Sequence, residues 1–209
     1  MRLNLGIRRR LAPLLDNDRR KIELANSLLF TLPGSPIIYY GDEIGMGDDI
    51  HLPDRNGVRT PMQWDNDHNA GFSSAPPDKL YAPIIQAQPY GVQWVNVAEQ
   101  RTKPDSLWHS LQRMIAVRKA HASFGWGDLA WVETGSAAVA AYQRNYRDEH
   151  LLILNNLSQH AQPLNIELPP GGVIEFSDIL TDKESLRSNG GKLELTLQPY
   201  EVRWLKRSN

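Results

Sequence analysis

Cysteine is absent from the 209-residue chain. There is therefore no disulfide framework, no thiolate nucleophile and no metal site built on cysteine ligands. This absence fits a reducing compartment, so we expect a cytoplasmic protein. A large net charge is also absent: the formal value is −1, which gives no electrostatic footprint for nucleic acid. No apolar run approaches the ~20 residues of a membrane span, and we expect neither nucleic acid nor a membrane as a partner.

Acidic residues are missing from the first fifteen positions, which contain Arg2, Arg8, Arg9 and Arg10. Such a start has some features of a signal or transit peptide. However, the apolar stretch at 11–15 is shorter than the ~7–15-residue core of a signal peptide, and no small-residue cleavage site follows it. We therefore expect a basic amphipathic helix here.

The composition is that of an ordinary soluble globular protein, with 41% apolar and 22% charged residues. Residues 19–32 and 105–119 repeat apolar side chains at helical spacing, and Pro33 follows the first of these stretches. Between them, Ile37–Tyr40 form an unbroken apolar run. Such a run is typical of a strand buried on both faces, as in a parallel sheet.

Residues 41–103 show little regular pattern and are rich in Gly, Pro, Asp and Asn. A connection of this length is typical of a lid or a binding loop. Its acidic cluster, Asp48, Asp49 and Asp54, suggests a site for a hard cation, but the spacing is not that of a calcium loop. The six histidines include no His-X₃-His pair, which argues against zinc. We expect no metal and no cofactor.

After His121 the sequence carries seven short strand-like runs, separated by turn signals such as RDE, PPGG and SNGG. Their length and spacing predict an antiparallel sandwich or an open barrel. We therefore expect domains at 1–120 and 121–209. We expect the aromatic residues after residue 120 to form most of a small hydrophobic core. An exposed pair among them would suit glucan binding. These aromatic residues are Trp126, Trp131, Tyr142, Tyr146 and Trp204.

Two quoted stretches carry a family resemblance. SPIIYYGDEIGMGDD at 35–49, followed by DRNGVRTPMQW at 54–64, resembles the end of the catalytic barrel in glycoside hydrolase family 13. Within that family the chain is similar to the trehalose synthases (maltose α-D-glucosyltransferases). Oligo-1,6-glucosidases share RTPMQW, whereas the GIRRRLAPLL lead-in and the later VNVAEQ favour the trehalose synthases.

The resemblance implies a fold of the class α/β plus all-β. Residues 1–120 would be the C-terminal portion of a catalytic (β/α)₈ TIM barrel, with 41–103 as its long active-site loop. Residues 121–209 would be a C-terminal antiparallel β-sandwich. In such barrels the loops after the strands form the active-site face, and Asp42 and Glu43 follow the predicted strand there.

The expected catalytic groups are not found in the sequence. A retaining reaction at a glucosidic bond needs two carboxyl groups about 5–5.5 Å apart. Asp42 and Glu43 are adjacent, so in extended backbone they point to opposite faces. The family's motifs for nucleophile, acid/base and third aspartate are missing, and His68 lies in DNDHN rather than in an Asn-His-Asp motif. A complete barrel takes about 250 residues, so we expect a fragment without catalytic residues that is inactive in isolation.

The resemblance implies five sugar-binding candidates, which are Arg55, Arg59, Asp42, Glu43 and Trp64. It places Arg55 near the reducing-end glucose and Arg59 beside the inner pocket, and the guanidinium fork suits both roles. Alternatively, each arginine holds the loop through a carboxylate or a carbonyl. For Asp42 and Glu43 the two alternatives are that they order the loop or that they contact sugar. For Trp64 they are that it stacks on a sugar ring or that it anchors the loop.

The implied function is that of the C-terminal part of a trehalose synthase, which interconverts maltose and trehalose by intramolecular glucosyl transfer in a site closed to water. One alternative is part of a family 13 α-glucosidase of the oligo-1,6-glucosidase type. The other is a non-catalytic glucan-binding or partner-docking protein. The implied partners are maltose and trehalose in the complete enzyme, a second copy of the chain, or a maltokinase.

Overall fold

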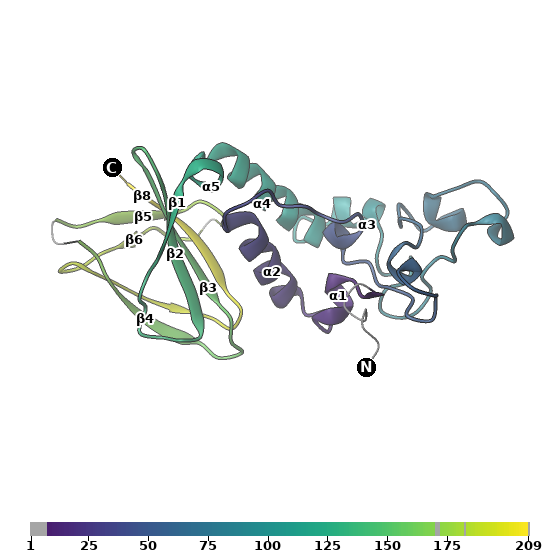
Figure 1. Ribbon diagram of the computed structural model, residues 1–209, viewed down its shortest axis with the longest axis horizontal. Helices are drawn as coiled ribbons and strands as arrows, with labels where there is room; N and C mark the ends of the chain where they lie inside the picture. The colour runs from purple at the N-terminus through teal and green to yellow at the C-terminus, as the bar shows by residue number, and fades with distance from the viewer. Residues whose placement is uncertain (1–7, 170–171, 182, 209) are drawn as a thin grey trace. The chain divides into compact units, whose positions relative to one another are not determined.

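The computed structural model describes residues 8–169, 172–181 and 183–208, which form two compact units (Figure 1). Unit 1 contains residues 1–22 and 37–112, and unit 2 contains 23–36 and 113–209. Two helices contribute residues to both units: α2 at Arg19–Thr31 and α4 at Leu107–Ala120. Both were predicted from their apolar spacing, and their ends lie within two residues of the predicted bounds.

Unit 1 is built mostly of irregular backbone. Besides the parts of α2 and α4, its α-helices are α1 at Leu11–Leu14 and α3 at Val97–Thr102. Single turns of 3₁₀-helix interrupt the long loop, at Asp42–Ile44, Asn56–Val58, His68–Gly71 and Pro77–Lys79. The sequence predicted a basic helix at the N-terminus, but Arg8, Arg9 and Arg10 precede the short α1. Residues 1–7 lie outside the described part.

A small apolar core holds this loop together. Ile44, Met46, Met62, Val95 and Val97 pack on one another, with the partly buried Trp108 against them. Because the loop has no sheet ladder, buried side chains bond its backbone instead. The Gln63 amide donates to the carbonyl oxygens of Val95 at 2.5 Å and of Tyr90 at 3.0 Å. The unit is thus ordered by side-chain hydrogen bonds as well as by apolar packing.

The strand predicted at Ile37–Tyr40 does not form. The segment is not part of any sheet, and Ile37 is 84% exposed. The prediction of burial on both faces was therefore wrong for this chain. A parallel strand is buried only when neighbouring strands bond its two edges and helices cover its faces, and none of the described strands lies before residue 128.

Unit 2 contains every strand of the described chain, arranged in two antiparallel sheets (Figure 1). The six-stranded sheet has the order β1-β2-β3-β8-β5-β6, and the two-stranded sheet pairs β4 with β7. A short helix, α5 at Ser123–Trp126, precedes them. The strands are β1 Asp128–Trp131, β2 Val139–Tyr146, β3 Glu149–Asn156, β4 Gln162–Glu167, β5 Glu175–Asp178, β6 Leu186–Arg187, β7 Lys192–Leu197 and β8 Val202–Arg207. All seven predicted runs are strands, and the two-residue β6 is additional.

The alternation of side chains explains how the two sheets pack. The core is formed by Leu152, Leu154 and Leu205 of the large sheet, by Leu164, Ile166, Leu193 and Leu197 of the small one, and by Ala141, Ile174 and Phe176. β4 and β7 alternate buried and exposed residues, as strands with one face in water do. β3 is buried along both faces from Leu151 to Asn156, so its run LLILNN does not alternate.

The second face of the large sheet packs on the part of α2 that belongs to unit 2. Tyr142, Ile153 and Trp204 are register partners on adjacent strands and share this face. The Trp204 indole N–H donates to the Ser27 hydroxyl at 2.8 Å, and the hydroxyls of Tyr142 and Thr31 lie 2.6 Å apart. These bonds satisfy the polar atoms that the aromatic side chains bring into the core.

The aromatic residues of unit 2 divide into two groups. Tyr142 and Trp204 are fully buried, as predicted for a small core. By contrast, Trp126 is 78% exposed and Trp131 is 67% exposed, so the core prediction was wrong for both. Trp131 lies on the edge strand β1, with its ring against the ring of Tyr142 at 5.4 Å between centroids.

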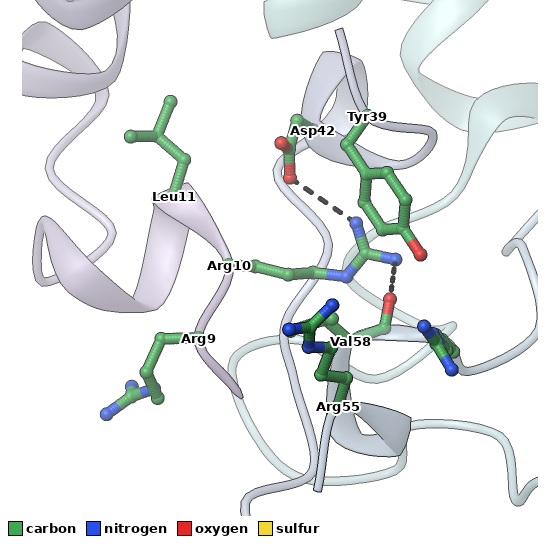
Figure 2. A pocket seen from close by; sticks show the side chains of 8 residues that line it. Arg9, Arg10, Leu11, Tyr39, Asp42, Arg55 and Val58 are labelled. Atoms are coloured by element: carbon green, nitrogen blue, oxygen red, sulfur yellow. Dashed lines mark hydrogen bonds and ion pairs between the residues drawn. The ribbon is translucent and has the colours of Figure 1, made fainter. Parts of the chain in front are cut away.

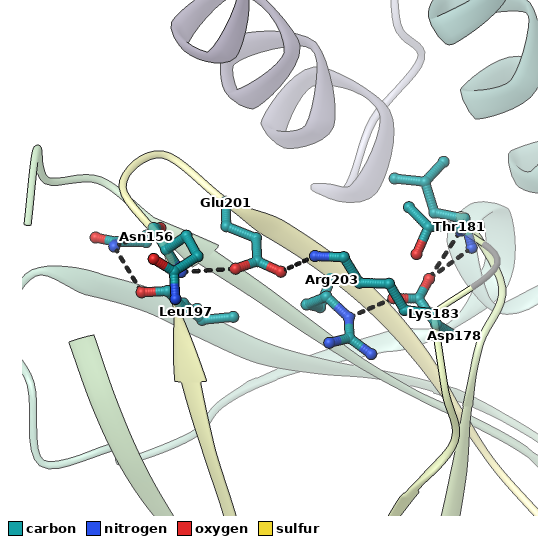
Figure 3. A network of polar contacts seen from close by, with 9 residues as sticks. Asn156, Asp178, Thr181, Lys183, Leu197, Glu201 and Arg203 are labelled. Carbon is teal, nitrogen blue, oxygen red and sulfur yellow. Dashed lines mark hydrogen bonds and ion pairs between the residues drawn. The ribbon is translucent and has the colours of Figure 1, made fainter. Parts of the chain in front are cut away.

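Charged side chains form a network of polar contacts in unit 2 (Figure 3). Asp178 is buried, pairs with Arg203, and accepts the backbone N–H groups of Leu180 and Thr181. Nearby, Glu201 pairs with Lys183. The first pair joins β8 to the end of β5, and the second joins the residue before β8 to the segment after β5.

Candidate functional site

A hollow of about 390 Å³ in unit 1 gathers most of the predicted sugar-binding residues (Figure 2). It is lined by Arg9, Arg10, Leu11, Tyr39, Asp42, Arg55, Val58 and Arg59. Three chain segments therefore meet here: the N-terminal arginines, the YGDE turn, and the DRNGVR loop. A second hollow of about 580 Å³ shares Arg9 and is lined by Asp48, Asp49 and His51 among others. Of these two hollows, the first is lined by three of the five predicted residues and the second by none, so the first is the candidate site.

Arg10 holds the three segments of the site together. Its side chain is 1% exposed, and it donates to the carbonyl oxygens of Tyr40 at 2.6 Å and Val58 at 2.9 Å. Its guanidinium lies 5.2 Å from the ring centre of Tyr39 and 4.9 Å from that of Tyr40, within cation–π range. Figure 2 shows the guanidinium between Asp42, Tyr39 and Val58. The arginine run was visible in the sequence, but its basic character suggested an exposed helix face.

Asp42 enters the hollow from a tight turn. Gly41 precedes it with φ 88°, a left-handed conformation in which a Cβ would also meet the Met46 sulfur at 2.4 Å. Asp42 and Glu43 therefore lie in a helical turn, and the extended backbone assumed from the sequence was wrong. Burial raises the pKa of Asp42, and the Arg10 guanidinium, 3.3 Å from its carboxylate, partly opposes that rise.

The arginines of the DRNGVR loop face the hollow with open donors. Arg55 and Arg59 are exposed, and neither side chain has a hydrogen-bond or ion-pair partner among the described residues. The turn at Asn56–Val58 sets their spacing. A Cβ on Gly57 would lie 2.2 Å from the Asp49 carbonyl oxygen, so the close approach of the two backbones there requires glycine. Neither arginine holds the loop through a carboxylate, as the alternative expectation had it.

The remaining predicted residues lie outside this hollow. Glu43 does not line it, and the Glu43 Oε2 atom is buried without a hydrogen-bond partner in the described part. Trp64 is 48% exposed. Its backbone is anchored on both sides, because its N–H donates to Ala70 O at 2.9 Å and its C=O accepts from Ala98 N at 2.8 Å. The structure thus brings together Asp42, Arg55 and Arg59, and not Glu43 or Trp64.

The acidic residues that suggested a cation site have other partners. The Asp48 carboxylate accepts from Arg9 Nε at 3.1 Å and from the Arg10 backbone N–H at 2.7 Å. Asp49 accepts the His51 backbone N–H at 3.0 Å. Over residues 8–208, apart from the undescribed 170, 171 and 182, no group of three His, Cys, Asp or Glu side chains is arranged to hold a metal ion.

Tyrosine hydroxyls brace the back of the site. Tyr40 donates to the Thr60 carbonyl at 2.8 Å, and Tyr81 donates to the Arg59 carbonyl. Burial raises the pKa of Tyr40, and the neighbouring Tyr81 raises it further. The Tyr40 phenol therefore stays protonated at neutral pH and serves as a donor. Together with Arg10, the two tyrosines fix the backbone on which Arg55 and Arg59 stand.

This arrangement suits binding rather than bond cleavage. Arginine forks orient hydroxyl or carboxylate oxygens, and the ring of Tyr39 supplies an apolar wall. Asp42 is the single carboxylate among the lining residues, and it is engaged by Arg10. A pair of carboxylates across a glucosidic bond is therefore not formed by the residues that line this hollow.

Comparison with known proteins gives the family. The model described as "Alpha amylase, catalytic domain" matches residues 8–127. The chain belongs to the alpha-amylase family. The model described as "Maltogenic Amylase, C-terminal domain" matches residues 129–204. The expected fold, the end of a catalytic (β/α)₈ domain followed by an antiparallel C-terminal domain, is thereby confirmed.

Individual members of the alpha-amylase family differ in how similar they are to this chain. The chain is 52% identical over 172 residues to a trehalose synthase of Pimelobacter sp., which covers 80% of this chain and 30% of that protein. An oligo-1,6-glucosidase of Halalkalibacterium halodurans is 25% identical over 224 residues, covering 90% of this chain and 38% of that protein. The crystal structure of an alpha-amylase from H. orenii superposes with a TM-score of 0.73 at 26% identity, over 96% of this chain and 38% of that one.

The chain corresponds to part of these proteins. The match covers 30% of the Pimelobacter enzyme, and residues 129–204 match the model of a C-terminal domain. The similarity to the C-terminal part of a trehalose synthase, expected from the sequence, is therefore confirmed. None of the described helices is long and apolar enough to cross a membrane.

Proposed function

We propose that the chain supplies part of the sugar-binding wall and the C-terminal domain of a trehalose synthase, which interconverts maltose and trehalose by intramolecular glucosyl transfer. The observation that carries this proposal is the hollow in which Arg55 and Arg59 present open donors beside Asp42. The 52% identity to a trehalose synthase, against 25% to an oligo-1,6-glucosidase, favours isomerisation over hydrolysis of an α-glucoside.

In this proposal each residue of the site has a stated role. Arg55 binds hydroxyl groups of the sugar at the open side, and Arg59 supports the inner pocket, each through a planar fork of N–H donors. Asp42, held by Arg10, accepts from a sugar hydroxyl. Glu43 and Trp64 act as loop anchors outside the hollow. The groups that attack and protonate the glucosidic bond lie outside the hollow described here.

The domain arrangement and the setting are also proposals. Residues 1–120 belong to the catalytic domain, with 41–103 as a loop that closes over sugar and excludes water. Residues 121–209 form the C-terminal domain. The protein acts in cytoplasmic carbohydrate metabolism on maltose and trehalose, and a second copy of the chain or a maltokinase associates with the complete enzyme.

A fusion tests the proposed function. The segment of the Pimelobacter trehalose synthase that matches this chain is replaced by the chain itself, and maltose is supplied. We expect trehalose to accumulate, while the chain without the rest of the enzyme forms none. A folded fusion that releases only glucose would support the α-glucosidase alternative. A folded fusion without any turnover would contradict the proposed function.

A second candidate function rests on two exposed tryptophans of unit 2. Trp126 and Trp131 are 78% and 67% exposed, and indole faces bind sugar rings by stacking. The candidate is glucan binding by the C-terminal domain. Affinity electrophoresis of the chain in gels containing soluble starch tests it: retardation that is lost in Trp131→Ala supports binding, and equal mobility with and without starch excludes it.

A further inference from the structure

The inner face of the large sheet, which packs on the small sheet, changes from apolar to polar along its strands. Leu152 of β3 and Leu205 of β8 are register partners in the core between the two sheets. Because strand side chains alternate, the residues two positions further along share this face, and they are His150 and Arg207. The apolar core therefore ends at a level where the sheet presents an imidazole and a guanidinium group.

This polar level extends across four strands. Asn145 of β2 is the register partner of His150, and Phe176 of β5 is that of Arg207. The His150 Nδ1 atom lies 3.1 Å from Asn145 Oδ1, and Asn145 Nδ2 donates to Gln143 Oε1 at 3.3 Å. These contacts hold the polar side chains of β2 and β3 in fixed orientations. Arg207 takes no part in them.

A hollow of about 220 Å³ is lined by these five side chains. The segment after β4 and the residue before β5 add apolar walls, and these wall residues are Leu168, Pro169 and Ile174. Apolar walls around a few placed polar groups are typical of small-molecule sites. The hollow is smaller than the ~300–1,000 Å³ of sites for drug-sized ligands, so it suits a compact molecule.

Charge restricts the ligand further. Arg207 is half-buried, and its guanidinium group has no hydrogen-bond or ion-pair partner among the described residues. None of the described residues that line the hollow is acidic. Asp178 shares the face of the sheet, but its carboxylate is occupied by Arg203 and by two backbone N–H groups. A cation with open donors in such a hollow is best matched by a carboxylate, which fits the guanidinium fork.

We propose that this hollow in unit 2 binds a small organic anion, with its carboxylate on Arg207 and a compact apolar body against Phe176 and Leu168. A neutral sugar lacks the charge that Arg207 calls for, and an inorganic anion lacks the apolar body that the walls call for. The proposal concerns unit 2 alone, so it stands or falls independently of the sugar-binding hollow and of the proposed function.

Titration of the full chain with benzoate and with the smaller butyrate tests the proposal. Binding is followed at neutral pH by shifts of the NMR signals of His150 and Arg207, and by the rise in melting temperature that a ligand of the folded state produces. Acetate lacks the apolar body, and benzamide lacks the charge. We expect each of them, as well as inorganic phosphate and glucose, to bind at least about tenfold more weakly than the better of the two probes.

One substitution and a matched control locate the binding. Arg207→Met removes the charge and should weaken binding of the probes at least about tenfold. It should not lower the melting temperature without ligand, because Arg207 has no partner to lose among the described residues. Lys206→Met removes a charge from the next residue of β8, whose side chain points to the opposite face, and should bind the probes as the wild type does.

Several results would overturn the proposal. They are no binding of either probe by the wild type, equal binding by the wild type and Arg207→Met, or an equal loss in Lys206→Met. Acetate or phosphate binding as tightly as the probes would contradict the apolar body, and benzamide doing so would contradict the role of the charge. If Arg207→Met melts below the wild type, Arg207→Lys decides instead. It keeps the charge without the fork, and wild-type affinity in that variant counts against the proposal.

Discussion

Replacing Arg10 by methionine should loosen the whole candidate site. The substitution removes three hydrogen bonds, to Tyr40 O, Val58 O and the Asp42 carboxylate. Hydrogen bonds from a charged donor contribute about 1.5–3 kcal/mol each and are not additive, and the ring contacts add about 0.5–2 kcal/mol. Methionine recovers part of the apolar packing. We therefore expect a loss of about 3–5 kcal/mol, as is usual when one partner of a buried ion pair is removed.

The pKa of Asp42 provides a readout specific to this pair. Burial raises that pKa and Arg10 opposes the rise, so Arg10→Met should raise it further. Because the pKa of Asp42 is raised in the folded protein, the ionised carboxylate destabilises the folded state at neutral pH. This destabilisation disappears as the pH falls and the carboxyl group is protonated. The difference in stability between wild type and Arg10→Met should therefore be largest at neutral pH and smaller in acid.

Hydrogen exchange and carboxyl NMR titration measure both effects. Amides of unit 1 near Tyr40 and Val58 should exchange faster in Arg10→Met, whereas those of β3 in unit 2 should not change. Arg113→Met, at an exposed arginine of α4, is the control and should leave both measurements as in wild type. Unchanged exchange around the hollow together with an unchanged Asp42 titration would refute the role assigned to Arg10.

Substitutions at four further positions test separate parts of the structure. Arg144 is 1% exposed and donates to the carbonyl oxygens of Thr31, Phe124 and Gly127, so Arg144→Ala should lower the free energy of unfolding of unit 2 by about 3 kcal/mol, measured by urea denaturation. Burial alone would raise the pKa of Glu149, but hydrogen bonds from Ser123 and His121 outweigh it and lower that pKa. The ionised Glu149 therefore adds stability above pH 4.5, its ordinary pKa, which is lost as the pH falls through the folded value. Glu149→Gln should flatten this acid limb of stability in urea titrations between neutral pH and acid, and an identical pH profile would contradict the assignment. Gly57→Ala places a Cβ 2.2 Å from Asp49 O and should cost about 1–3 kcal/mol, while speeding proteolysis of the 41–103 loop; wild-type resistance would show that the two backbones separate freely. In the active fusion, Arg55→Ala should lower trehalose formation relative to glucose release, with Arg55→Lys only partly restoring it, and an unchanged product ratio would exclude a role for Arg55 in the site.

The spacing of apolar residues predicted the helices and strands that pack against other parts of this same chain. The helices at α2 and α4 and the strand runs of unit 2 follow from the spacing of apolar residues, because each packs against other parts of the same unit. The apolar run at Ile37–Tyr40 predicted a buried strand, but its side chains are exposed and it pairs with none of the described strands. An apolar run therefore predicts that a segment would be stable if buried, but it does not show that the chain supplies the neighbouring strands that bury it.

The candidate site was predicted only in part. Asp42, Arg55 and Arg59 were identified through the family resemblance and do share one hollow. Arg10 was missed, because a run of arginines is usually solvated and only the fold shows that this one is buried against Tyr39 and Tyr40. Trp131 was misassigned to the core for the converse reason, since a tryptophan on a strand says nothing of whether that strand lies at the edge of its sheet.

Product analysis of the covalent fusion with maltose tests the central claim most directly. NMR distinguishes trehalose from glucose as the reaction proceeds. The proposed function predicts that trehalose is the main product and that the reverse reaction, from trehalose to maltose, proceeds on the same fusion. Glucose as the sole product from a folded fusion, with no conversion of trehalose, would contradict it.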